Sequence, residues 1–139
     1  MARPLRITYE GAFYHVTTRG NEGKKIFLSP ADYEKFLSYL RDALHKYGVI
    51  LHAFVLMANH YHLIVETPKA NLSTFMHALN SSYTTYFNLK RTREGHLFQG
   101  RYKAFLIDVD NYLLELSRYL HMNPVRAGIT ARPEEYPYS

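Results

Sequence analysis

Apolar and polar residues alternate between Gly11 and Thr18, and this alternation predicts a first β-strand. From Ser29 the apolar residues recur at helical spacing instead, at positions Tyr33, Phe36, Leu37, Leu40 and Leu44. The Ser29 side chain is expected to cap this helix, because serine is a favoured N-cap and Pro30 suits the first helical position. Gly48 is expected to end the helix.

A nearly continuous apolar run from Val49 to Met57 predicts a buried strand. Ala58-Asn59 follows as a tight connection, and the next strand is expected from His60 to Glu66. These two strands should therefore form a hairpin. A long second helix is then predicted from the spacing of Leu72, Phe75, Met76, Leu79, Tyr83, Tyr86 and Phe87.

The last third of the chain predicts a loop, a strand and a helix. Residues Arg91–Gly100 are basic and contain glycine, which is typical of a loop, and Tyr102–Ile107 is expected to be the fourth strand. Asp108 and Asp110 are candidate caps for a third helix that runs to about Met122.

The predicted order β-α-β-β-α-β indicates an α+β fold with a ferredoxin-like antiparallel sheet and an additional C-terminal helix. The chain contains no repeat, no low-complexity stretch and no long linker, so residues 1–139 are expected to form a single domain. Many nucleic-acid binders use this arrangement, but the fold does not establish a function.

Composition narrows the function classes. Hydrophobic residues make up 47% of the 139 residues, so burial can offset the entropy of the ordered chain. The net charge of +5 favours a polyanionic partner, because bound Lys and Arg release counterions from phosphates. Charge alone does not separate such a protein from one that is merely basic.

Cysteine is absent, which excludes disulfides, thiolate chemistry and cysteine-based zinc sites. The N-terminus carries no apolar signal core, and no apolar run approaches the ~20 residues that span a bilayer. We therefore expect a cytoplasmic protein without a membrane partner.

The segment Met57–Val65 contains two histidines with one residue between them. His60 and His62 should project from the same face of the predicted strand, with Tyr61 on the other. Two imidazoles held side by side suit a divalent metal ion. Two unrelated surface histidines are the alternative. His15 could approach the pair across a neighbouring strand, although we expect a structural role for it.

The predicted last helix places Tyr119 and Asn123 on one face, because they are four residues apart. A tyrosine hydroxyl with a pKa of about 10 needs help to attack a phosphate, and a nearby metal supplies it. From spacing alone, packing of Tyr119 in the core and capping of the helix by Asn123 are the better explanation of these two residues.

These motifs resemble the single-tyrosine HUH transposases, which include IS200-like insertion-sequence enzymes and REP-associated tyrosine transposases. Four stretches carry the resemblance in the family's order along nearly the whole chain: Gly11–Asn21, Met57–Leu63, Phe98–Lys103 and Tyr119–Gly128. One such motif is a weak signal, whereas four in order are a strong one.

The resemblance implies a role for each motif residue. His60, His62 and Asn123 would bind Mg²⁺ or Mn²⁺, with Asn123 where insertion-sequence relatives have glutamine. Tyr119 would be the nucleophile, and its spacing to Asn123 favours it over Tyr112. Such enzymes cleave single-stranded DNA, often hairpin-containing, through a 5′-phosphotyrosine link and later rejoin it. The sequence does not decide between a monomer and a homodimer.

Contacts with DNA need cations outside the metal site. The candidates lie mostly in loops or at the ends of predicted elements, which is consistent with phosphate contact. They are Arg19, Lys24, Lys25, Lys90, Arg91, Arg93, Arg101, Lys103 and Arg126. For any single residue, a solvated surface position is an equally good explanation.

Three alternatives stay open at this point. The chain could be a non-catalytic module that binds single-stranded nucleic acid, although it lacks a close match to the aromatic strand signature of RNA-recognition domains. It could be a hydrolase that activates water at His60 and His62, leaving no protein–DNA adduct. Structural zinc is a third option, but two histidines and one amide oxygen suit closed tetrahedral zinc poorly.

Overall fold

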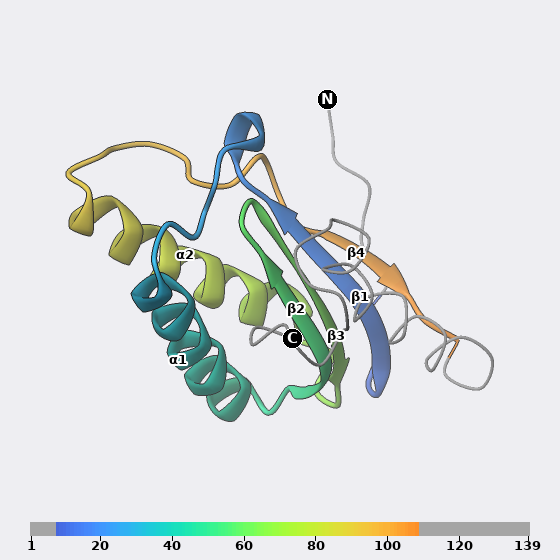
Figure 1. The fold of residues 1–139 in the computed structure, drawn as a ribbon. Helices are drawn as coiled ribbons and strands as arrows, with labels where there is room; N and C mark the ends of the chain where they lie inside the picture. Colours follow the sequence, from blue (N-terminus) through green and yellow to red (C-terminus); the bar gives the residue numbers. More distant parts are fainter. Residues whose placement is uncertain (1–7, 109–139) are drawn as a thin grey trace, which may run out of the picture.

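The computed structural model describes residues 8–108, and its elements follow the predicted order (Figure 1). They are β1 (Ala12–Arg19), the short 3-10 helix η1 (Asn21–Gly23), α1 (Pro30–Tyr47), β2 (Ile50–Met57), β3 (His60–Thr67), α2 (Leu72–Lys90) and β4 (Lys103–Leu106). The β-α-β-β-α-β prediction is therefore confirmed. The predicted third helix, with Tyr119, Asn123 and Arg126, lies outside the described residues.

The four strands form one antiparallel sheet in the order β2-β3-β1-β4. β1 is thus an inner strand with β3 on one side and β4 on the other. Thr17 pairs with His62 of β3 and with Lys103 of β4, and Arg19 pairs with His60. This register brings residues that are far apart in the sequence to the same end of the sheet.

Helices α1 and α2 cover one face of the sheet (Figure 1). Residues Ala12, Tyr14 and Val16 of β1 point into this core and are almost inaccessible to solvent. Tyr61 of β3 points the same way and is fully buried, and its hydroxyl donates to the Asn80 side chain on α2. The predicted separation of Tyr61 from His60 and His62 is confirmed, and the histidines are left on the opposite face.

A second cluster of buried residues lies on the face that carries the histidines. Its members are Ala53, Val55, Met57, Ile64 and Ile107. The second half of β2, from Ala53 to Met57, therefore has buried residues on both faces, which explains why this part of the strand is continuously apolar rather than alternating.

The start of α1 differs in one detail from the prediction. Pro30 is the first helical residue, and Gly48 ends the helix in the left-handed conformation with φ of 65°, as expected. Ser29 precedes the helix, but its side chain makes no capping hydrogen bond. Its hydroxyl instead accepts a hydrogen bond from Lys90, and the Asp32 carboxylate accepts the free N–H of Leu28.

Asp32 is completely buried and joins α1 to the end of α2. Its carboxylate accepts hydrogen bonds from Arg91, Lys90 and Tyr86. Burial alone would raise the pKa of Asp32, but the hydrogen bonds from Leu28, Arg91, Tyr86 and Lys90 outweigh it and lower the pKa below the ordinary value. Asp32 is therefore held as a paired carboxylate.

The loop after β1 is fastened to the β2–β3 turn. The backbone N–H groups of Ile26 and Phe27 donate to the Ala58 carbonyl, and that of Gly20 donates to the Asn59 carbonyl. The chain approaches itself so closely here that a Cβ at Gly20 would lie 2.0 Å from the Lys24 carbonyl oxygen. Within residues 8–108, no helix is long and apolar enough to cross a membrane.

Candidate active site

His60 and His62 begin β3 directly after the tight turn and lie on the same face, as predicted from their spacing. Both are half-buried, and their ring centroids are 5.1 Å apart with the rings nearly perpendicular. They form one wall of a pocket of about 440 Å³. The pocket is lined by Thr17, Thr18, Arg19, His60, His62, Gln99, Arg101 and Lys103.

The hydrogen bonds around His60 determine which of its nitrogens is available. Its Nδ1 lies 2.7 Å from the side-chain oxygen of Asn59, whose amide NH₂ donates to the Gly23 carbonyl. An amide oxygen only accepts hydrogen bonds, so His60 must donate from Nδ1. The lone pair is therefore on Nε2, and this outer contact fixes the ring orientation as such contacts do for metal-binding histidines.

His62 has an unexpected partner on β1. Its Nδ1 lies 2.9 Å from Nε2 of His15, and the two rings are stacked with centroids 5.1 Å apart. One of these nitrogens donates and the other accepts. His62 has a free lone pair on Nε2 only in the arrangement where it donates from Nδ1 and His15 accepts. We expect a structural role for His15 from the sequence, whereas the fold joins it to the pair.

Both predicted ligands are held in the neutral form. Burial and the positive charge of Arg19 lower the pKa of His60 below 6.5. Burial, together with the neighbouring His60 and His15 rings, lowers the pKa of His62 to about 3. Burial also lowers the pKa of His15. Imidazoles that are neutral near pH 7 keep the lone pairs that metal ions require.

The rest of the pocket is positive. Arg19 comes from the end of β1, Arg101 from the segment just before β4 and Lys103 from the first position of β4, with all three residues exposed. None of the described residues that line the pocket is acidic. Cations without neighbouring carboxylates attract phosphate groups, and the pocket therefore suits the backbone of a nucleic acid.

The donor set fits a divalent ion in part. Two neutral imidazoles are ordinary ligands for transition metals, and His62 presents a free Nε2 when it donates to His15. Within residues 8–108, however, no three His, Cys, Asp or Glu side chains are grouped to hold a metal ion. The described residues thus offer two ligands, and Asn123, the predicted third, lies outside them.

The structure separates the predicted DNA-binding cations into two groups. Arg19, Arg101 and Lys103 line the pocket. Arg91 and Lys90 are bound to Asp32. The remaining described candidates also lie away from the pocket lining: Arg93 bonds to Asn88 and the His96 carbonyl, Lys24 pairs with Glu22, and Lys25 is exposed in the loop after η1.

Sequence reasoning missed four residues of the site: Thr17, Thr18, Gln99 and Asn59. Gln99 enters the pocket because its N–H donates to the Arg19 carbonyl, and an isolated bridge joins Gly20 to Phe98 just beside it. Thr17 shares the face of His15 in the predicted alternation, a signal that was available. Asn59, predicted only as part of a turn, orients His60.

Comparison with known proteins finds a matching family and solved structures of similar fold. Residues 8–123 match the family described as transposase IS200 like. A solved REP-associated tyrosine transposase bound to a REP hairpin has a similar fold, with a TM-score of 0.83 and 18% identity, covering 99% of this chain and 81% of that one.

A candidate transposase from Deinococcus radiodurans R1 is also similar, with a TM-score of 0.58 and 17% identity over 86% of this chain and 95% of that one. Identities this low show a shared fold and nothing finer. No curated protein matches the chain. Because the family match runs over most of the sequence, the chain belongs to the IS200-like transposase family.

Proposed function

We propose that this protein nicks and rejoins single-stranded DNA, with Tyr119 as the nucleophile and a divalent metal ion held by His60, His62 and Asn123. The observation that carries the proposal is the pocket itself. It combines two neutral imidazoles with Arg19, Arg101 and Lys103 and has no acidic lining residue among those described. Family membership supports the same chemistry.

The described residues have two tasks in this proposal. Arg19, Arg101 and Lys103 bind and orient the phosphates on either side of the cleaved bond, because exposed cations position a strand without reading its sequence. His60 and His62 present lone pairs to Mg²⁺ or Mn²⁺. When bound, such an ion supplies a Lewis acid that polarises a non-bridging phosphate oxygen.

The proposed cleavage is a transesterification. The phenol oxygen of Tyr119 forms a bond to phosphorus and loses its proton, while the bond between phosphorus and the 3′ oxygen breaks and that oxygen gains a proton. One phosphate ester is exchanged for another, so a 3′-hydroxyl can reverse the step without an external energy source.

We propose hairpin-containing single-stranded DNA as the substrate. The similar solved transposase is bound to a REP hairpin. The pocket in this chain is compatible with a single strand, because its cations and its hydrogen-bonding residues are grouped at one end of the sheet rather than spread along a helix. A hairpin would then hold that strand near the pocket.

A covalent-adduct assay tests the proposal. The substrate is a pool of random single strands, each with a fixed hairpin and a label on the 3′ end, incubated with Mn²⁺. Because Tyr119 stays linked to the 5′ end of the downstream fragment, which carries the 3′ label, we expect labelled DNA to migrate with the protein on a denaturing gel.

Two variants serve as controls. Tyr119→Phe should abolish the adduct and keep DNA binding, and His62→Ala should abolish both the adduct and Mn²⁺ binding. Cleaved DNA without any adduct would instead indicate a hydrolase that activates water. An undiminished adduct with Tyr119→Phe would exclude Tyr119 as the nucleophile.

A further inference from the structure

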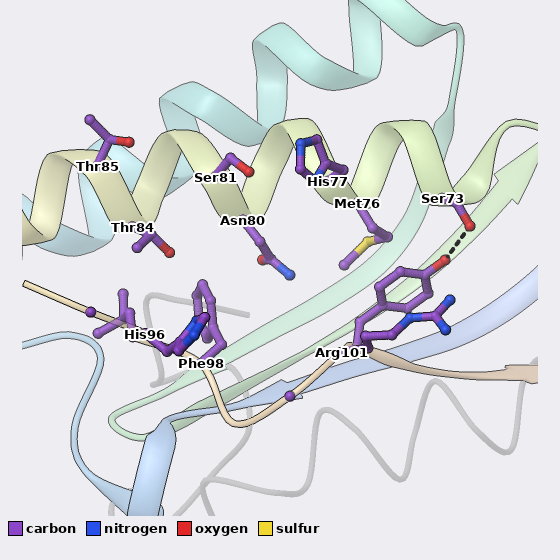
Figure 2. A pocket seen from close by; sticks show the side chains of 14 residues that line it. Ser73, Met76, His77, Asn80, Ser81, Thr84, Thr85, His96, Phe98 and Arg101 are labelled. Atoms are coloured by element: carbon purple, nitrogen blue, oxygen red, sulfur yellow. Dashed lines mark hydrogen bonds between the residues drawn. The ribbon is translucent and has the colours of Figure 1, made fainter. Parts of the chain in front are cut away.

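A second and larger pocket, of about 660 Å³, lies between α2 and the segment that leads into β4 (Figure 2). We call it the α2 groove. Its lining comes from α2 at Ser73, Met76, His77, Asn80, Ser81, Thr84 and Thr85, and from the facing segment at Gly95, His96, Leu97, Phe98, Gly100, Arg101 and Tyr102.

The helix side of the α2 groove has an unusual composition for a solvent-facing helix. Over Leu72–Lys90 only the last residue, Lys90, is charged. The stripe on this side of the helix carries hydroxyls, an amide and an imidazole at helical spacing. Figure 2 shows Asn80 and Thr84 pointing toward the opposite wall. Surface helices ordinarily carry charged residues on such a face.

Small uncharged donors suit the backbone of a nucleic acid. Serine, threonine and asparagine side chains make a large share of protein contacts to phosphates and sugars. Ser81 and Thr84 are short, so a polymer can approach the helix closely at these positions. The groove lining contains no acidic residue that would repel phosphates.

The opposite wall connects this groove with the proposed active site. Arg101 lines both pockets. His96 and Phe98 belong to the wall opposite α2, and His96 is exposed. Tyr102 is held in the wall by a hydrogen bond between its hydroxyl and that of Ser73, 2.8 Å apart. An exposed imidazole gives an unpaired base a surface to stack on.

We infer that the α2 groove binds nucleotides of the single strand that continues past the cleaved phosphate, with hydroxyls of α2 on its backbone and His96 against a base. The inference rests on the proposed function, because the strand reaches the groove by way of Arg101. It adds a recognition surface outside the metal site, so part of the affinity for DNA comes from residues that take no part in cleavage.

Two neighbouring serines give a matched test. Ser81 lines the groove. Ser82, the next residue of the same helix, is also exposed but does not line the groove. Ser81→Asp and Ser82→Asp introduce the same charge with the same effect on helix propensity. The affinity of each for a fluorescein-labelled single strand of random sequence is measured by anisotropy, and thermal unfolding checks that both variants fold.

We expect Ser81→Asp to weaken binding about fivefold relative to Ser82→Asp, the factor for one pair of like charges about 4 Å apart in water. Equal affinity of the two variants, with tight binding by the unchanged protein, would overturn the inference that the α2 groove binds DNA and would leave the proposed function intact. Failure of the unchanged protein to bind the single strand would overturn both.

Discussion

His15 Nε2 and His62 Nδ1 lie 2.9 Å apart on adjacent strands. The two histidines are not directly opposite each other in the sheet, since His15 lies opposite Ile64 and His62 lies opposite Thr17. The two rings meet diagonally across β1 and β3, which is within reach of aromatic side chains. β1 therefore contributes to the histidine pair even though both predicted ligands belong to β3.

Replacing His15 with Ala should weaken Mn²⁺ binding by about 10- to 100-fold, the usual loss when an outer contact to a ligating histidine is removed. His15→Gln should retain more affinity, because its amide oxygen can still accept the hydrogen bond from His62. Mn²⁺ affinity is measured by electron paramagnetic resonance in the absence of DNA. Unchanged Mn²⁺ affinity in His15→Ala would show that His15 does not position His62.

Arg101→Ala should reduce the salt dependence of single-stranded DNA binding, because Arg101 faces both pockets. The loss of one phosphate contact lowers the slope of log affinity against log salt by about 0.7 for a single strand. The matched control is Arg93→Ala, since Arg93 is bound to Asn88 and the His96 carbonyl and lines neither pocket. Equal slopes for the two variants would contradict the proposed phosphate contact.

Asp32→Asn should destabilise the fold by about 3 kcal/mol, because it removes one partner of a buried ion pair and leaves Arg91 without its counter-charge. This destabilisation is at the lower end for the loss of one partner of a buried ion pair, because the Arg91 side chain is still 21% exposed to solvent. Urea unfolding measures the loss. Asp42→Asn on the exposed face of α1 should change the free energy of unfolding very little. Equal losses of unfolding free energy in the two variants would argue that the contacts of Asp32 with Tyr86, Lys90 and Arg91 do not stabilise the packing of α1 against α2.

The Asp32 cluster also predicts how stability depends on pH. The pKa of Asp32 in the folded protein is below the ordinary 3.8. The stabilisation that the Asp32 carboxylate provides is therefore present above pH 3.8 and is lost as the pH falls further. The difference in unfolding free energy between the unchanged protein and Asp32→Asn should thus be constant at neutral and mildly acidic pH and shrink below about pH 4. Urea unfolding across this range checks it, and a difference that grows on acidification would reverse the assigned sign.

Local patterns were enough to predict most of the fold. Alternation in β1, helical spacing in α1 and α2, and the apolar run of β2 each gave the right element, with bounds within about two residues. The shared face of His60 and His62 followed from the two-residue period of a strand. These features depend only on neighbours along the chain.

Contacts between residues far apart in the sequence could not be predicted, because they do not depend on neighbours along the chain. The contact of His15 with His62 depends on the register of two strands that no hairpin turn connects. Arg91 resembles a DNA-binding loop cation in the sequence, but its guanidinium meets a carboxylate 59 residues away. Gln99 reaches the pocket only through its bond to the Arg19 carbonyl. Each outcome is set by packing rather than by local propensity.

Pairing of Asp32 with Lys90 and Arg91 gives the protein an uneven electrostatic landscape. The Asp32 carboxylate offsets one of the two positive charges of Lys90 and Arg91, whereas no carboxylate is among the described residues that line the pocket of Arg19, Arg101 and Lys103. An approaching polyanion is therefore attracted more strongly by these unpaired pocket cations than by Lys90 and Arg91. Encounters are guided toward one end of the sheet before any close contact forms.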